Sequence, residues 1–281
     1  MPAKAGSVEG RWVGPVDMVD APYLVGRGIS DVTGELWGCG LLGYGKADQV
    51  SKGLHTRLRT RAFIVVDPAS DDRVLICVSD LPLMFDSVHR EVLRRLAATY
   101  GDVYTDVNTM LTVTHTHCGP GGYSHHRLYN MTTHGFHPLT FQAIVDGIVE
   151  AVERAHTDIA PATLTLSRGT LEDASVNRSP QSFARNPEAD KAHFPNAVDP
   201  QTTLLRVERG GRVVGAINWF ATHGTSMTNK NCLVSADNKG YAAYHWERVV
   251  TGVDYLADPV PDFISAFAQT NAGDMSPNLN R

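Results

Sequence analysis

Short apolar runs that stop at polar or turn-forming residues recur along this chain and predict β-strands. Two pairs of runs are separated by turn signals, at 68–72 and 208–212, which predict hairpins or paired strands. The predicted strands are 61–66, 74–79, 109–114, 162–171, 203–207, 213–220 and 263–267.

Two other segments, 87–100 and 138–155, repeat apolar residues at the spacing of one helix face. In the first, Ser87 stands where an N-cap belongs and Gly101 is a stop signal. The apolar positions are Val88, Val92, Leu96 and Tyr100, then Phe141, Ile144, Val145, Ile148 and Val152. Strands and helices together predict an α/β fold with a mixed central β-sheet flanked by helices.

The four prolines between 172 and 200 predict a long ordered loop there, of the kind that often covers a site. No repeat, low-complexity run or interdomain linker interrupts residues 1–281.

Composition narrows the class of protein. With 42% hydrophobic and 20% charged residues, the chain can bury a substantial core. The formal charge of −5, with both signs mixed along the chain, gives no reason to expect nucleic-acid binding. The first ten residues do not resemble a signal peptide, and no window has the roughly 18 apolar residues of a membrane span. The compartment therefore remains open.

Histidines are concentrated in one stretch, with six of the twelve between 115 and 137. His115 and His117 form an H-x-H pair after the strand 109–114, and alternation sends both rings to the same side of the backbone. The strand 213–220 delivers His223, and the strand 263–267 leads to Ser276. Because sites in α/β proteins collect at strand ends, we expect a metal site at the C-terminal ends of these strands.

Other reactive residues have ordinary explanations. The polar, turn-rich context indicates surface or lining positions for His125, His126, His134 and His137. The four cysteines form no CxxC pair, and Cys118 is better explained as a small residue in a tight turn than as a nucleophile. Arg178 fits a solvated loop charge or a donor to an oxyanion equally well. Ser276 precedes Pro277 as turn serines do, and no G-x-S-x-G elbow is present.

Five motifs, in this order along the chain, resemble the neutral/alkaline (non-lysosomal) ceramidases. They are Thr114-His115-Thr116-His117-x-Gly119-Pro120, Asn177-Arg178-Ser179-Pro180, Trp219-Phe220-x-x-His223-x-x-Ser226-Met227, Asp237-Asn238-x-Gly240-Tyr241-Ala242 and Asn271-x-Gly273-Asp274-x-Ser276-Pro277-Asn278.

The resemblance implies a zinc amidohydrolase that cleaves the N-acyl amide of ceramide to sphingosine and a fatty acid. It assigns Zn²⁺ to His115 and His223, ties His117 and Arg178 to catalysis, and makes Ser276 the active-site serine. Members of the family are often secreted or membrane-associated, which makes contact with a membrane surface an expectation for substrate access.

The family also supplies further zinc ligands, a Glu and a Tyr, and an immunoglobulin-like domain from sequence beyond Arg281. Residues 1–281 are therefore expected to be the N-terminal portion of the catalytic domain. A catalytic zinc usually has three protein ligands, so we expect this chain alone to bind zinc weakly and turn over poorly.

Alternatives stay open at this point. Ser276 is a covalent nucleophile or a residue that orients substrate or water. The protein is a ceramidase, a metal-dependent hydrolase of another amide or ester, or a lipid-binding module without turnover.

Overall fold

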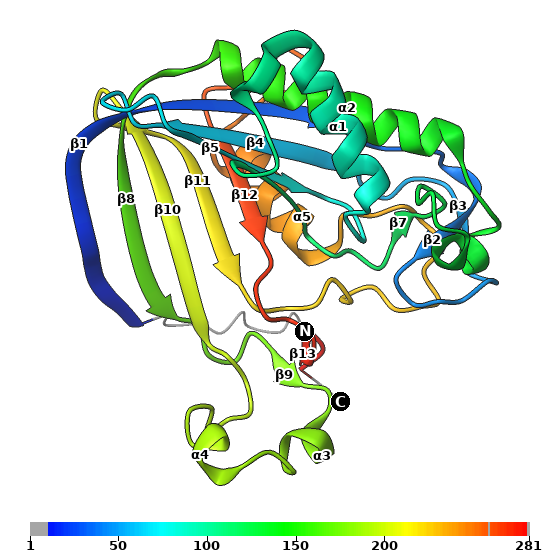
Figure 1. The fold of residues 1–281 in the computed structure, drawn as a ribbon. Helices are drawn as coiled ribbons and strands as arrows, with labels where there is room; N and C mark the ends of the chain where they lie inside the picture. The colour runs from blue at the N-terminus through cyan, green and yellow to red at the C-terminus, as the bar shows by residue number, and fades with distance from the viewer. Residues whose placement is uncertain (1–10, 258, 280–281) are drawn as a thin grey trace.

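One mixed β-sheet of eight strands, in the order β12-β11-β10-β8-β1-β4-β5-β6, organises the molecule (Figure 1). This computed structural model describes residues 11–257 and 259–279, with side chains from residue 23 onward. The pairs β11–β12 and β5–β6 are parallel and the other neighbours are antiparallel, which confirms the predicted mixed sheet. The strands are β1 Arg11–Asp31, β4 Arg59–Val66, β5 Arg73–Ser79, β6 Thr109–Val113, β8 Ala160–Thr170, β10 Gln201–Arg209, β11 Arg212–Phe220 and β12 Ile264–Ala268.

Two helices, α1 (Asp86–Tyr100) and α2 (Pro138–Thr157), cover one face of the sheet where β1, β4 and β5 lie (Figure 1). The helix α2 lies so close to β1 that a Cβ on Gly26 or Gly28 would fall about 2 Å from a carbonyl oxygen of α2. A third helix, α5 (Asp237–Tyr244), packs against β12 and continues as a π-helical turn, His245–Val250.

The sheet curls, because both of its halves contribute to one core on the face opposite α1 and α2. Alternation in β4 directs Ala62 and Ile64 toward the helices and Phe63 toward this second core. Phe63 clusters there with Ile217 of β11 and Ile264 of β12. Strand β12 also contacts β4 and β5, although several strands separate them in the sheet. The two ends of the sheet are thus brought together.

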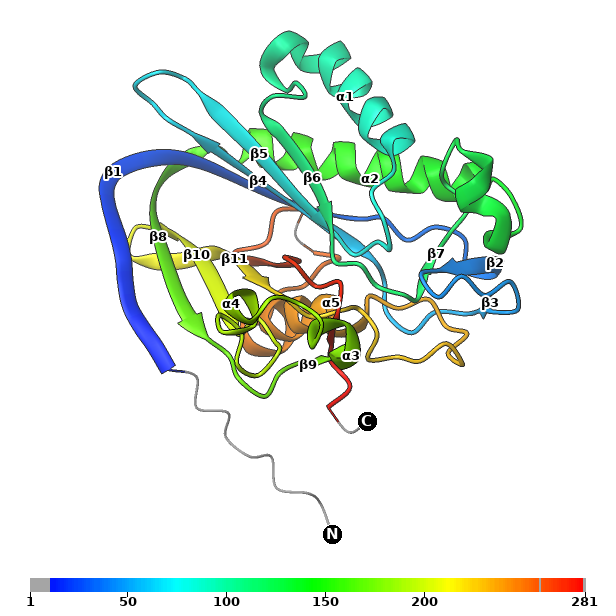
Figure 2. The ribbon, with the colours of Figure 1, turned by 60° about the horizontal axis from the view of Figure 1, so that its bottom comes forward.

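Shorter elements complete the fold. The long predicted loop 172–200 contains two four-residue helices and one short strand, and in Figure 2 it lies in front of the strands (Figure 2). That strand, β9, pairs with β13, so the loop is attached to the segment that holds Ser276.

The shorter elements outside the main sheet are β2 Trp37–Leu42, β3 Val50–Lys52, β7 Gly119–Pro120, β9 Val176–Asn177, β13 Met275–Ser276, α3 Pro180–Phe183, α4 Glu188–Lys191, and the 3-10 helices Gly101–Val103 and Arg127–Thr133.

The expected cap of α1 was wrong in one respect. The N-cap position is Phe85, without a side-chain hydrogen bond, and the Ser87 hydroxyl donates to the carbonyl of Tyr123 instead. Gly101 does end the helix, with φ of 61° and its N–H donating to Ala97. The tertiary contact to Tyr123 therefore outweighs the local capping preference of serine.

Candidate active site

Three histidine side chains converge at the C-terminal ends of two strands. His115 and His117 follow β6, and His223 follows β11. Nε2 of His115 lies 3.0 Å from Nε2 of His223 and 3.2 Å from Nε2 of His117. One ring nitrogen from each of the three lies within 4.8 Å of the other two, so these residues could hold a metal ion. Within the described part of the chain, no other group of three His, Cys, Asp or Glu is so arranged.

The two strand ends meet through backbone contacts. Thr116 and Gly224 form an isolated parallel bridge, and the His117 N–H donates to the Gly224 carbonyl at 2.9 Å. A Cβ on Gly224 would lie 2.2 Å from the carbonyl oxygen of His115, so glycine is needed for this approach. Gln269, just after β12, donates to the carbonyls of both Thr114 and Thr222. The segments that carry the histidines are therefore tied directly to each other.

Hydrogen bonds at Nδ1 set the state of two of the three rings. Nδ1 of His115 lies 2.7 Å from the Pro82 carbonyl oxygen, and Nδ1 of His223 lies 2.8 Å from that of Ala272. A carbonyl oxygen only accepts, so both Nδ1 atoms carry a proton and, in the neutral rings, both Nε2 atoms carry a lone pair. Such Nδ1–H donation to a carbonyl is typical of histidine metal ligands. Two lone pairs that face each other at 3.0 Å suit a shared cation.

His117 differs from the other two. Its Nδ1 is buried and has no hydrogen-bond partner among the described residues, so no carbonyl selects its tautomer. The Tyr44 ring packs against its imidazole in a T-shaped arrangement, with ring centroids 4.7 Å apart. Burial lowers the pKa of His117 to about 3, and so does the repulsion that a proton on this ring would meet from His115, His223 and Arg178. At neutral pH His117 is therefore a neutral imidazole.

The serine and arginine motifs lie together beside His223. Strands β9 and β13 pair Val176 with Ser276, and the Arg178 guanidinium donates to the Gly273 carbonyl at 2.7 Å. The Arg178 side chain is exposed, and its charge contributes to the lowered pKa of both His117 and His223, after burial. The His223 N–H donates to the Met275 carbonyl at 2.9 Å. Three motifs that are far apart in sequence thus form one region.

Ser276 itself is fully buried. Its Oγ accepts a hydrogen bond from the Asn278 N–H at 3.3 Å, and Asn278 also donates through its side chain to the Thr225 carbonyl. These contacts fit the turn role that any serine before proline can have.

The remaining histidines of the His-rich stretch lie outside the cluster. His125, His126 and His134 are exposed, and His137 contacts the Glu35 carboxylate through Nδ1. Burial raises the pKa of the Cys118 thiol to about 11, which fits a structural residue better than a nucleophile.

Sequence reasoning missed the role of the residues that open α5. The Asp237 carboxylate accepts hydrogen bonds from the N–H groups of Ser226 and Met227, and the Asn238 amide donates to the His223 carbonyl at 2.8 Å. The signal was present, because Asp237 and Asn238 begin one of the five motifs, but spacing alone does not show that they hold the loop after His223.

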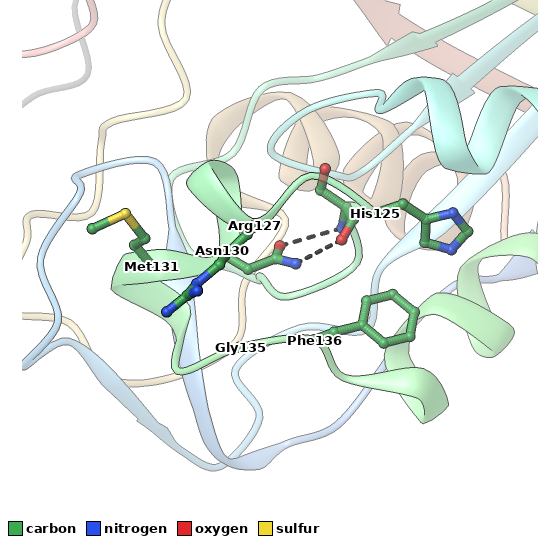
Figure 3. Close-up of a pocket in the computed structure, with 7 residues that line it drawn as sticks. His125, Arg127, Asn130, Met131, Gly135 and Phe136 are labelled. Atoms are coloured by element: carbon green, nitrogen blue, oxygen red, sulfur yellow. Dashed lines mark hydrogen bonds between the residues drawn. The ribbon is translucent and has the colours of Figure 1, made fainter.

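A hollow of about 620 Å³ opens in the segment between His117 and α2. Figure 3 shows His125 and Phe136 on one side of it and Met131 on the other, with Asn130 hydrogen-bonded to Ser124 (Figure 3). Several apolar side chains in this segment and at the start of α2 are exposed to solvent, and Met131 and Phe136 among them line the hollow. We call Leu128, Met131, Phe136 and Leu139 the apolar rim; they are 72%, 67%, 45% and 70% exposed. Among the described residues, none of the helices has the length and apolarity to cross a bilayer.

Known proteins resemble this chain in sequence and in fold. Residues 23–281 match the family described as neutral/alkaline non-lysosomal ceramidase, N-terminal. The neutral ceramidase of Mycobacterium tuberculosis is 63% identical over 91% of this chain, and that of Pseudomonas aeruginosa is 46% identical over 95%. The crystal structure of the Pseudomonas aeruginosa enzyme superposes on 92% of the chain with a TM-score of 0.86, and a ceramidase complexed with C2 superposes with 0.85.

The matched region is a part of these relatives, since it spans 40% and 38% of the two curated sequences. The match nevertheless runs through all five motifs and through every residue of the histidine cluster. The chain belongs to the neutral/alkaline non-lysosomal ceramidase family.

Proposed function

We propose that this protein is a zinc-dependent amidohydrolase that cleaves the N-acyl amide of ceramide to sphingosine and a free fatty acid. The observation that carries the proposal is the convergence of three imidazole Nε2 atoms within a chain of this family. We further propose that residues 23–281 correspond to the N-terminal portion of the ceramidase catalytic domain.

His115 and His223 are the proposed zinc ligands. The donor set fits, because imidazole nitrogen is a common zinc ligand and both rings present an unprotonated Nε2 toward the same point. When bound by these two residues, zinc would supply a Lewis acid for the amide carbonyl and for the attacking water.

The other proposed site residues move protons and stabilise charge. His117 acts as general base that takes a proton from the attacking water or hydroxyl, and it then returns this proton to the departing amine. Arg178, fixed by its bond to Gly273, provides positive charge for the oxyanion that develops on the amide oxygen. Ser276 either attacks the carbonyl as a covalent nucleophile or orients substrate.

Release of fatty acid from a labelled ceramide tests the proposal, on this chain and on the chain extended by any native sequence that follows Arg281. From the extended chain we expect release that a chelator abolishes, that zinc restores and that Ser276→Ala lowers by more than about a hundredfold, the scale on which loss of a catalytic group acts. From this chain alone we expect little release, because further zinc ligands are expected beyond Arg281. Single-turnover trapping separates the two roles of Ser276, since an acyl-enzyme forms in the nucleophilic one alone.

Failure of this assay has two informative forms. No release from a folded, zinc-loaded protein would move the assignment to a hydrolase of another amide or ester, which a panel of such substrates would identify. A folded protein that binds ceramide in the absence of any zinc and cleaves none of these substrates would be a lipid-binding module.

The apolar rim is the proposed contact with the membrane surface that contains the substrate. Transfer of an exposed apolar side chain into lipid is favourable by about 1.5–3 kcal/mol. We expect a Leu128→Asp/Met131→Asp variant to bind ceramide-containing phosphatidylcholine vesicles at least about tenfold more weakly in a sedimentation assay, because two such side chains are lost. Val107→Asp is the matched control, since Val107 is 95% exposed on another loop. Equal vesicle binding by all variants would reject this surface.

A further inference from the structure

Lys239 is buried in α5 without a carboxylate partner. Its side chain is 4% exposed, and it appears in none of the ion pairs among the described residues. Its Nζ instead donates to two backbone carbonyl oxygens, of Phe220 at 2.8 Å and of Ala268 at 2.9 Å. A buried lysine amine without a counter-ion is costly in its charged form, so its retention here calls for a reason.

The two acceptors are the last residues of β11 and β12, which are parallel neighbours in the sheet. His223 follows Phe220 by three residues. The segment after Ala268 begins with Gln269, which binds the ends of both histidine segments, and leads to Ala272, whose carbonyl receives Nδ1–H of His223. Lys239 thus binds the last residue of β11, before the segment that holds His223, and the last residue of β12, before the segment that leads to Ser276.

Neighbouring side chains act on the same loop. Asp237 accepts from Ser226 and Met227, Asn238 donates to the His223 carbonyl, and Lys239 donates to Phe220. Three consecutive residues of α5 therefore hold residues 220–227 from the start of the loop to its end. A lysine suits the innermost position because even its neutral amine has two N–H donors, which match the two carbonyls.

We propose that Lys239 is a positioning residue for the proposed reaction. By joining the carboxyl ends of β11 and β12, it keeps His223 and the segment that holds Ser276 in place next to His115. The expected effect on zinc binding rests on the proposed function. The hydrogen bonds that join the two strand ends are a property of the fold.

Lys239→Met tests it, because methionine keeps an unbranched apolar side chain and removes the donors. In metal-free protein we expect amide hydrogen exchange in 220–224 and 269–276 to accelerate by at least about tenfold, since two buried hydrogen bonds are lost. Zinc affinity, measured by competition with a chromophoric chelator, is expected to fall by about tenfold to a hundredfold, the usual effect of removing support behind a ligand. The visible spectrum of bound Co²⁺ should change as well, because it reports ligand geometry.

Two further variants separate positioning from general loss of stability. Val92→Ala weakens the core under α1, away from these strand ends, and should leave exchange in the two segments and the Co²⁺ spectrum as in the wild type. Lys239→Gln retains an NH₂ donor and should recover part of the zinc affinity that Lys239→Met loses. If Lys239→Met does not fold, Lys239→Gln is compared with the wild type in its place, with the expected changes smaller in size.

Unchanged exchange and an unchanged Co²⁺ spectrum in the Lys239 variant would overturn the inference, and so would the same changes in Val92→Ala. Zinc binding by the wild-type protein tests the proposed function, and a protein that binds no zinc would contradict it. Hydrogen exchange is measured without metal, so its result decides the role of Lys239 in either case.

Discussion

Replacing His115 by alanine is expected to reduce the zinc affinity of the chain by more than about a hundredfold, and to remove zinc-dependent amide hydrolysis with it. Loss of a partner behind a metal ligand costs about tenfold to a hundredfold in affinity, and loss of the ligand itself costs more. Nε2 of His115 lies 3.0 Å from Nε2 of His223, so a cation bound by both would lose one of these two nitrogen ligands. Competition with a chromophoric chelator measures the affinity directly.

His134→Ala is the matched control, because His134 lies in the same His-rich stretch but contacts the Ala47 carbonyl and stands outside the cluster. We expect it to bind zinc as the wild type does, and His223→Ala to behave like His115→Ala. Equal zinc affinity in His115→Ala and His134→Ala would show that the metal is bound elsewhere or that no specific site exists.

Replacing Glu247 by alanine is expected to lower the free energy of unfolding by about 3–5 kcal/mol, the usual cost of leaving a buried charge without its partner. Glu247 is fully buried and receives two hydrogen bonds of 2.8 Å from the Arg61 guanidinium, one from the Tyr255 hydroxyl and one from the Ser265 N–H. In the variant, Arg61 keeps a single carboxylate partner, Asp80 at 3.1 Å. Urea denaturation followed by circular dichroism measures the change.

Glu188→Ala provides the contrast, since Glu188 pairs with Lys191 on the surface and its side chain is 91% exposed. Such pairs contribute little because water and salt screen them, so its urea midpoint should match that of the wild type. A small effect of Glu247→Ala, similar to that of Glu188→Ala, would mean that the buried network does not stabilise the fold.

The Glu247 network also reaches toward the candidate site. Arg61 binds Asp80, and the next two residues, Leu81 and Pro82, accept hydrogen bonds from the backbone and the ring of His115. The tautomer of His115 therefore depends on a turn that a buried ion pair fixes, and partial unfolding around Glu247 should weaken metal binding as a secondary effect.

Features with a local physical cause could be predicted from sequence. The apolar spacing of 87–100 and 138–155 led to α1 and α2, because a helix repeats its buried face every 3.6 residues whatever surrounds it. The strands that precede His115 and His223 were also predicted, which placed these residues at strand ends. The long strand β1 was missed, because Pro15, Pro22, Gly26 and Gly28 weaken the local strand signal. Its two glycines are needed for the approach of α2, which is a tertiary requirement.

By itself, then, the sequence determined α1 and α2, seven of the eight strands of the main sheet and the motifs that carry the chemistry of the family. The tertiary structure alone decided that β6, at one edge of the sheet, and β11, next to the other edge, end at the same place. It also decided that α5 forms and that Lys239 and Glu247, which carry no signal of burial in the sequence, are buried. The physical reason is that periodicity reports contacts between residues near in sequence, whereas the curl of the sheet results from the shared core around Phe63 and Ile217, whose partners are far apart in the chain.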